Sequence, residues 1–293
     1  MPFTYEDIRP LKERVRQQKK MMEDTEDDWV CVVCGDTGSG KSLLVLSLFE
    51  DYCKQYFTDS SSDENFKAFT NTDEGWIRSI SMFRNNAYRM IVHDEAVNIL
   101  YAKNAITKKN KGVNILFKQI RGKQYYHFMV IPQVHRIDKE FREDRIKNII
   151  YVEKKKDKRI AHYYTTKRTH QVLNELEQMN KNRRDKDMIT SLKYCKTKPL
   201  FSCIVPLYKG KYLKMYKPKK HENMNTAITE AEITFLGKSA VDSYERLQKG
   251  YKIRKLLSQG KLKQEIMKEM GIKDYQTLNK YAKMAKTHEE SVS

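Results

Sequence analysis

Eight residues at positions 35–42, Gly-Asp-Thr-Gly-Ser-Gly-Lys-Ser, constrain the fold of this chain more than any other feature. They follow a short run at 29–34 that is apolar and rich in β-branched residues, which predicts a buried strand. They precede an apolar run at 43–49 that predicts a helix buried on most sides. Glycines at these positions allow backbone N–H groups to turn inward around an anion. The segment therefore predicts a strand–loop–helix unit that binds phosphate groups.

This loop matches the pattern G-x-x-x-x-G-K-[ST] at every fixed position. Lys41 would reach the β- and γ-phosphates of a nucleoside triphosphate, and the Ser42 hydroxyl would ligate Mg²⁺. The positive N-terminal end of the following helix would point at the same phosphates. We therefore expect ATP and Mg²⁺ as cofactors. The residues expected to hold the nucleotide are Gly35, Asp36, Thr37, Gly38, Ser39, Gly40, Lys41 and Ser42.

Two adjacent acids, Asp94 and Glu95, follow a second apolar run at 90–93 that predicts another buried strand. We expect Asp94 to hold Mg²⁺ through water, and Glu95 to orient and polarise the water that attacks the γ-phosphate. The alternative is that both acids cap a helix N-terminus. Small-molecule kinases with this type of loop usually lack the second acid. Glu95 therefore favours a Mg²⁺-dependent P-loop ATPase that converts ATP to ADP and phosphate.

Gln133 follows a third predicted buried strand at 126–131. Because the carboxyl ends of parallel strands carry ligand groups, this side chain could bond both the lytic water and the γ-phosphate. The alternative is an ordinary polar residue after Pro132. Four arginines surround this strand, and one of them could reach a neighbouring subunit's γ-phosphate as an arginine finger, although each could equally form a surface salt bridge. They are Arg121, Arg136, Arg142 and Arg145.

The order of strands and helices predicts an α/β fold. With the loop, it indicates a RecA-like P-loop fold with a mostly parallel sheet and helices on both faces. We expect a polar N-terminal leader at 1–28, an ATPase domain at 29–235 and a helical module at 244–293. A region at about 151–220 is expected to be rich in β-hairpins, one around a basic turn at 154–159 and one over 201–216.

The basic excess of the chain is confined to two segments. The chain has 57 Lys and Arg against 38 Asp and Glu, a formal net charge of +19. Residues 151–220 hold 20 basic and 6 acidic residues, and residues 241–293 hold 12 and 7, so the remainder is neutral. A segregated excess favours a polyanionic partner such as DNA, and the alternative is a solvated lysine-rich surface.

Composition argues against several classes of protein. No run of about 18 apolar residues occurs, so we expect no membrane insertion. The first residues lack the apolar stretch of a secretory signal. Five cysteines, an odd number, argue against a disulfide scaffold and favour a cytoplasmic location. Cys31 and Cys34 lie in the first predicted strand, where we expect them to be buried core residues and not metal ligands.

Residues 245–286 resemble a helix-turn-helix unit, with Gly271 at the turn and Asp274 as the cap of a third helix. In this interpretation the third helix and its start would contact DNA. The alternative is a small helical lid or oligomerisation module. The candidate DNA-binding residues are Lys273, Gln276, Thr277, Asn279, Lys280 and Lys283.

Over residues 29–153 the sequence resembles the FtsK–HerA superfamily of ring-forming, DNA-pumping ATPases. The matching segments are the loop, Ile91–Ala96, Lys118–Gly122 and His127–Gln133. The family places an arginine on a helix ahead of a buried strand and ends that strand with Gln. Arg121 and Gln133 match these two positions, so the resemblance implies that Arg121 is the arginine finger and that Gln133 contacts the γ-phosphate. The compact core is most similar to archaeal and viral genome-packaging ATPases and mobile-element ATPases.

The resemblance implies an ATP-hydrolysing translocase that moves double-stranded DNA as a homo-oligomeric ring, packaging a viral or mobile-element genome. A capsid or replication protein would be a further partner, and the location would be the host cytoplasm or the virion. The first alternative is an ATP-controlled DNA-binding regulator or partition-type switch with slow turnover. A nucleotide or nucleoside kinase is a third interpretation, disfavoured by Glu95 and by the basic second half.

Overall fold

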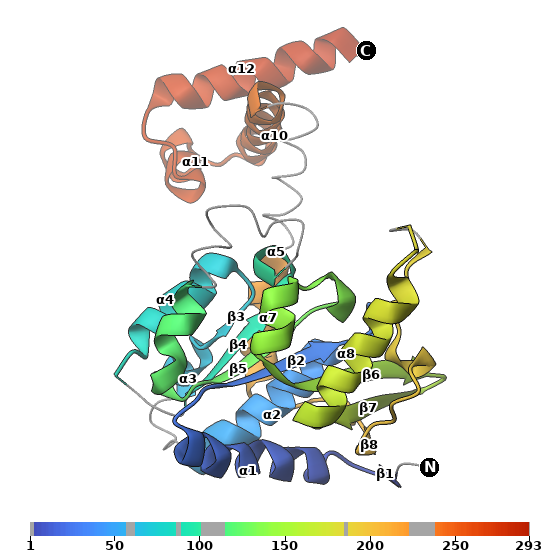
Figure 1. The fold of residues 1–293 in the computed structure, drawn as a ribbon. Helices are drawn as coiled ribbons and strands as arrows, with labels where there is room; N and C mark the ends of the chain where they lie inside the picture. Colours follow the sequence, from blue (N-terminus) through green and yellow to red (C-terminus); the bar gives the residue numbers. More distant parts are fainter. Residues whose placement is uncertain are drawn as a thin grey trace. The chain divides into compact units, whose positions relative to one another are not determined.

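The computed structural model describes residues 3–56, 62–85, 89–100, 115–184, 187–222 and 238–292. The chain divides into two compact units, Met1–Lys220 and His221–Ser293. The larger unit is built around a single sheet with helices on both of its faces (Figure 1). The smaller unit is entirely helical in its described part (Figure 1).

The sheet of the larger unit has the strand order β1-β8-β7-β6-β2-β5-β4-β3. Strands β6, β2, β5, β4 and β3 run parallel to one another. β7 is antiparallel to both β6 and β8, and β1 pairs with β8 in parallel. The strands are β1 (Phe3–Tyr5), β2 (Trp29–Cys34), β3 (Phe69–Thr70), β4 (Met90–Asp94), β5 (Tyr126–Val130), β6 (Ile146–Lys155), β7 (Lys158–Tyr164) and β8 (Phe201–Ile204). The expected α/β P-loop fold with a mostly parallel sheet is therefore confirmed.

Two apolar cores cover the two faces of this sheet. One contains Leu11 of α1 and Phe49 of α2, and the other contains Trp76 of α4, Phe117 and Leu176 of α8. Every residue of β2 is buried, because helices cover both faces of this parallel part of the sheet. The helices of the larger unit are α1 (Arg9–Thr25), α2 (Lys41–Tyr56), α3 (Ser62–Phe66), α4 (Asp73–Met82), α5 (Val97–Leu100), η3 (Arg121–Lys123), η4 (Val134–Arg136), α7 (Lys139–Asp144), α8 (Thr166–Asn180) and η6 (Leu192–Tyr194).

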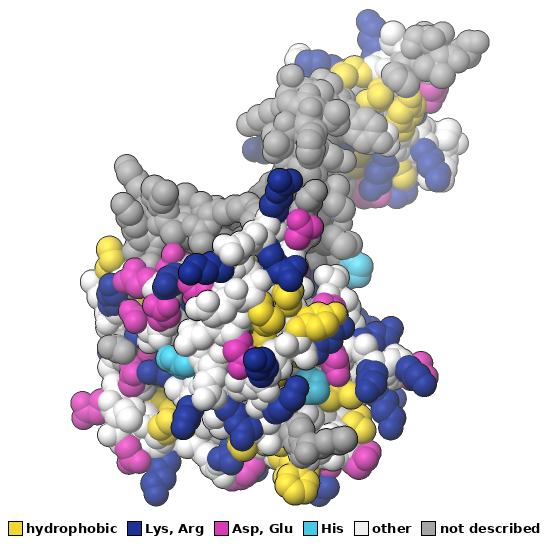
Figure 2. Space-filling view, turned by 45° about the vertical axis from the view of Figure 1, so that its right-hand side comes forward, with side chains coloured by type: hydrophobic (Ala, Val, Ile, Leu, Met, Phe, Trp, Pro, Cys, Tyr) yellow, Lys and Arg dark blue, Asp and Glu magenta, His cyan; other side chains and the backbone are white. Residues whose placement is uncertain are grey.

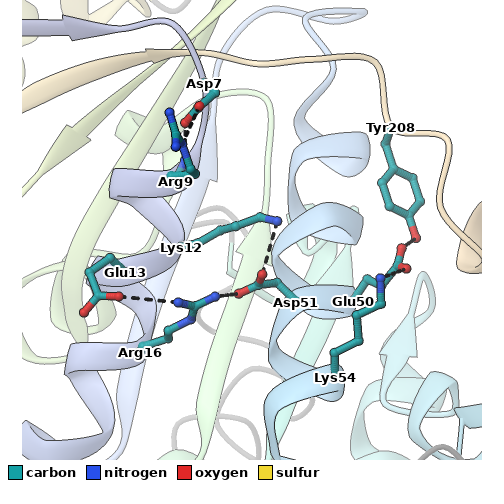
Figure 3. Close-up of polar contacts among 9 residues, drawn as sticks. All are labelled: Asp7, Arg9, Lys12, Glu13, Arg16, Glu50, Asp51, Lys54 and Tyr208. Atoms are coloured by element: carbon teal, nitrogen blue, oxygen red, sulfur yellow. Dashed lines mark hydrogen bonds and ion pairs between the residues drawn. The ribbon is translucent and has the colours of Figure 1, made fainter.

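The first 28 residues, expected as a polar leader, belong to the larger unit. β1 pairs with β8 at the edge of the sheet, and α1 buries Leu11 and Val15 in the core. On the polar side of α1, Lys12 and Arg16 pair with Asp51 of α2 at 3.2 and 2.9 Å (Figure 3). The apolar stripe of α1 and these ion pairs together attach it to α2.

The region at 151–220 matches its expectation only in part. β6 and β7 form the expected hairpin around the basic turn, with Lys154 opposite Arg159. The hairpin expected over 201–216 is wrong: only 201–204 form a strand, and residues 212–222 are helical. The spacing of the buried side chains explains the difference. Tyr212 and Tyr216 are both buried and lie four residues apart, which places them on one face of the helix and not on alternate faces of a strand.

The smaller unit packs three helices, α10 (Lys238–Ser258), α11 (Lys263–Met270) and α12 (Tyr275–Val292), around Ile253, Ile266 and Leu278. Gly271 ends α11 in the left-handed conformation, with φ of 62°. The carboxylate of Asp274 accepts a 2.7 Å hydrogen bond from the backbone N–H of Thr277 at the start of α12. The expected C-terminal helical segment is therefore present. None of the described helices in either unit is both long and apolar enough to cross a membrane.

Candidate nucleotide site

The loop at 35–42 connects β2 to α2 and passes close to β6. Gly35 has φ of 136°, and a Cβ atom there would lie only 2.0 Å from the carbonyl oxygen of Val152. A side chain at this position would therefore clash with the backbone of the neighbouring strand as well as strain its own. The loop needs glycine at its start because two backbone segments meet there.

Lys41 is the first residue of α2 and turns back over the loop. Its ammonium group donates hydrogen bonds of 2.8 Å to the carbonyl oxygens of both Gly35 and Asp36. Partial burial lowers the pKa of Lys41, and the nearby Asp94 carboxylate opposes this shift. The loop thus holds a positive charge at the N-terminus of α2, where the helix dipole also favours an anion.

Asp94 ends β4 and is buried beside Ser42, the second residue of α2. The Ser42 hydroxyl donates a 2.8 Å hydrogen bond to Oδ1 of Asp94, and the Tyr216 hydroxyl donates one of 2.6 Å to Oδ2. Burial and the Asp94 charge raise the pKa of Tyr216, so the phenol stays protonated as a donor. A hydroxyl beside a carboxylate is an oxygen donor set of the kind that Mg²⁺ prefers, so Ser42 and Asp94 fit the expected metal. Tyr216 was not among the residues expected from the sequence.

Glu95 occupies the next position and differs from Asp94 in its backbone conformation and in its exposure. Its φ is 72°, which is a strained left-handed conformation for a residue with a side chain. Its side chain is 64% exposed, and a carboxylate oxygen lies 3.8 Å from the Lys220 ammonium group. The carboxylate of Asp94 accepts from Ser42 and Tyr216 rather than from a helix N-terminus. This arrangement favours separate roles for the two acids over a shared capping role.

Gln133 follows β5, the strand between β2 and β4, and is half-buried. The N–H of Gly35 donates to the carbonyl oxygen of Pro132 at 3.3 Å, and the N–H of Ala96 donates to that of Val130 at 3.0 Å. These bonds hold the end of β5 against both the loop and the segment after the acid pair. The structure therefore brings Lys41, Ser42, Asp94, Glu95 and Gln133 to one edge of the sheet.

The four candidate arginines are not equivalent. Arg145 is buried, and its guanidinium donates to Asp28 at 2.6 Å and to the carbonyl oxygen of Phe117 at 2.9 Å. Arg142 is also buried and donates to Glu177 at 2.8 Å. Asp28 is buried, whereas the side chain of Glu177 is 39% exposed. These contacts favour the alternative of a structural ion pair for both arginines.

Arg121 and Arg136 lie at opposite ends of β5. The backbone of Arg136 is in η4, directly after Gln133, and that of Arg121 is in η3, before the strand begins. Their side chains fall outside the described part of the chain. The whole length of β5 therefore separates the backbone of Arg121 from the loop at 35–42 in the same chain.

The candidate DNA-binding residues of the smaller unit cluster around the start of α12. Most of them are exposed, but Thr277 is half-buried and its hydroxyl donates to Asp274 at 2.9 Å, which is a capping role. Asn279 accepts a 3.2 Å hydrogen bond from Lys263 of α11. The exposed members are Lys273, Gln276, Asn279, Lys280 and Lys283.

No family model and no curated protein matches the sequence. The N-terminal domain of zonular occludens toxin from Neisseria meningitidis is 17% identical over 47% of this chain and 84% of its own, with a TM-score of 0.33. The genome packaging NTPase B204 from Sulfolobus turreted icosahedral virus 2, in complex with ATP-gammaS, is 13% identical over 58% of this chain and 88% of its own, with a TM-score of 0.34. The fold class rests on the chain's own parallel sheet and on the loop after β2.

Proposed function

We propose that this chain is a P-loop ATPase of the FtsK–HerA type. The observation that carries the proposal is the convergence of the loop, the Asp94–Glu95 pair and Gln133 at the carboxyl edge of one parallel sheet. In open sheets of this kind, ligands bind outside the carboxyl ends of the strands. No other set of described residues combines a phosphate-binding loop with acids placed to serve it.

Each group at this edge has a chemical role in ATP hydrolysis. Lys41 and the loop N–H groups bind the phosphates, and Mg²⁺ held by Ser42 and Asp94 would neutralise phosphate charge. Glu95 is exposed beside the site, where its carboxylate can accept a proton from an attacking water molecule. The amide of Gln133 can donate to the γ-phosphate and accept from the same water.

We further propose that hydrolysis moves double-stranded DNA through a homo-oligomeric ring, as in the packaging of a viral or mobile-element genome. The basic excess at 151–220 and 241–293 supports a polyanionic partner. Figure 2 shows Lys and Arg side chains spread over one face of the larger unit, with acidic side chains between them. Such a mixed surface suits transient phosphate contacts, which a moving protein must form and release.

The test is ATP turnover by the full chain without DNA and with double-stranded DNA of increasing length, together with the oligomeric state in solution. A motor should hydrolyse ATP faster as the DNA lengthens, up to a plateau, and should form a closed ring. Lys41→Ala is the matched control and should show no turnover under any condition. If DNA of every length left wild-type turnover unchanged, the translocase proposal would be wrong, while the ATPase assignment would survive.

The second candidate is an ATP-controlled DNA-binding switch. The observation that favours it is the capped start of α12, where exposed Lys, Gln and Asn side chains follow the turn at Gly271. A switch should bind one sequence tightly and turn over ATP slowly whatever the DNA length. Competition between a specific duplex and bulk DNA in a binding assay distinguishes it from a motor.

A further inference from the structure

The hairpin formed by β6 and β7 extends past the carboxyl end of β2, where the nucleotide loop begins. β6 runs parallel to β2 and is in register with it up to Cys34 and Tyr151. It then continues through Lys155, and β7 returns from Lys158. Since β2 gives way to the loop after Cys34, the end of this hairpin lies alongside the loop.

Arg159 of this hairpin packs directly against the loop. Its Cδ and Nε atoms lie 2.6 and 2.9 Å from the position that a Cβ atom on Gly40 would occupy. A side chain at position 40 would therefore occupy the space that the Arg159 side chain fills. In the sequence, Arg159 is one of several basic residues around the hairpin turn, and no local signal distinguishes it.

The guanidinium of Arg159 is not fully partnered in the described structure. Its Nε atom is buried, and it has no hydrogen-bond partner among the described residues. A buried donor without an acceptor is unfavourable, and an anion at this place would satisfy it. The loop beside it is built to hold phosphate oxygens, and the planar arginine fork matches phosphate well.

The position of Arg159 in the sheet indicates which part of the nucleotide it would meet. β2 lies between β5 and β6. Asp94 and Gln133, which mark the γ-phosphate end of the site, lie on the β5 side. Arg159 lies on the β6 side, so a nucleotide stretched across the loop would bring its α-phosphate and ribose to this arginine.

We infer that Arg159 is a nucleotide-binding residue that contacts the α-phosphate end of ATP within its own subunit. The inference rests on the proposed nucleotide site and assigns one end of it. The α-phosphate is common to ATP and ADP, so this arginine should contribute equally to the binding of both.

The experiment measures dissociation constants of ATP and ADP for the full chain by fluorescence titration. Arg159→Ala should weaken both nucleotides by the same factor, about ten- to hundredfold for a lost charged hydrogen bond. Arg159→Lys should fall between the wild type and Arg159→Ala, because it keeps the charge and loses the fork. Lys158→Ala is the matched control: successive residues of a strand point to opposite faces, so it should leave both constants unchanged.

Two results would overturn the inference. Unchanged constants in Arg159→Ala would show that the arginine does not touch the nucleotide. A loss confined to ATP would place it at the γ-phosphate instead. Weak binding of both nucleotides by the wild type would contradict the proposed nucleotide site itself, so the two failures are distinct. A thermal melt of each variant, compared with the wild type, excludes a loss of fold as the cause.

Discussion

Tyr216 and Asp94, which are 122 positions apart in sequence, are joined by a 2.6 Å hydrogen bond in which the phenol donates to Oδ2 of the carboxylate. The other oxygen of Asp94 accepts from Ser42. The helix at 212–222 and the end of the loop thus hold the same acid, each through one hydroxyl. Tyr216 is a positioning residue, since it acts on the proposed metal site through Asp94.

Tyr216→Phe should weaken the binding of the Mg²⁺ that supports ATP hydrolysis. The variant keeps the buried ring and removes the donor, so Asp94 loses a charged hydrogen bond worth about 1.5–3 kcal/mol. We expect the Mg²⁺ concentration for half-maximal turnover to rise by roughly tenfold or more. Tyr194→Phe removes a hydroxyl from a side chain that is 61% exposed and is the control. Identical Mg²⁺ titrations for Tyr216→Phe and the wild type would refute the positioning role.

Glu95→Gln should bind ATP and fail to cleave it. The amide keeps the size of the side chain and cannot take a proton from water, whereas the Ser42 and Asp94 contacts remain. We expect single-turnover cleavage to fall by about 10²-fold or more, with the ATP dissociation constant within about threefold of the wild type. The reverse pattern, lost affinity with preserved cleavage, would make Glu95 a binding or structural residue.

Most of the sheet around the site could be predicted from the sequence, because each central strand is a short apolar run next to a recognisable polar signal. β2 ends at the glycine loop, β4 at the two acids and β5 at Pro132 and Gln133. These signals are local, and they also identify the chemistry.

The contacts that could not be predicted are between distant segments. The four-residue spacing of Tyr212 and Tyr216 could have indicated a helix, but nothing in the neighbouring sequence shows that Tyr216 contacts Asp94. From the sequence, Arg145 is expected at the surface, because a charged side chain is buried only where it has a partner. Its partner, Asp28, is 117 positions away and cannot be recognised locally. Arg159 could not be predicted for a similar reason. It lies on β7, and the pairing of β7 with β6 and of β6 with β2 brings it to Gly40.

Arg145→Met should destabilise the larger unit and spare the chemistry. The variant leaves the Asp28 carboxylate buried without the guanidinium at 2.6 Å, and such a loss costs about 3–5 kcal/mol. Urea unfolding should show this decrease, and Asp28→Asn added to Arg145→Met should recover part of it. An arginine finger would behave in the opposite way, with unchanged stability and a loss of turnover per folded molecule.

His127 should make the larger unit less stable in mild acid. Burial in β5 and the charge of Arg145 lower the pKa of His127 to about 3. In the unfolded chain the pKa is about 6.5, so below that pH the unfolded state binds a proton that the folded state does not. Stability is therefore lost as the pH falls from about 6.5 towards 3, by about 1 kcal/mol between pH 7 and pH 5.5.

The check is urea unfolding at these two pH values, followed by tryptophan fluorescence. Both tryptophans, Trp29 and Trp76, are buried in the larger unit, so the signal reports on it. His127→Leu cannot titrate and should lose about 1 kcal/mol less than the wild type over the same interval. Equal losses in the two proteins would show that other groups cause the acid sensitivity.

The last prediction concerns Arg121, whose place before β5 sets it a full strand length away from the nucleotide loop of its own subunit. If this arginine serves catalysis, it must serve the site of a neighbour. A guanidinium that neutralises charge developing on the γ-phosphoryl group contributes about 10³-fold or more to turnover in related systems. Arg121→Ala should therefore bind ATP normally and hydrolyse it about 10³-fold more slowly.

Mixing two inactive variants tests whether the arginine acts between subunits. In an assembly of Arg121→Ala and Glu95→Gln chains, some interfaces bring an intact Arg121 from one chain to an intact Glu95 site in the other. Those interfaces should hydrolyse ATP, so activity should return on mixing and depend on the ratio of the two chains. The Glu95→Gln chain mixed with Lys41→Ala is the control, since neither contributes a complete site and no activity should appear. If Arg121→Ala and Glu95→Gln chains were shown to co-assemble and stayed inactive, Arg121 would act within its own fold, and Arg136 would become the candidate finger.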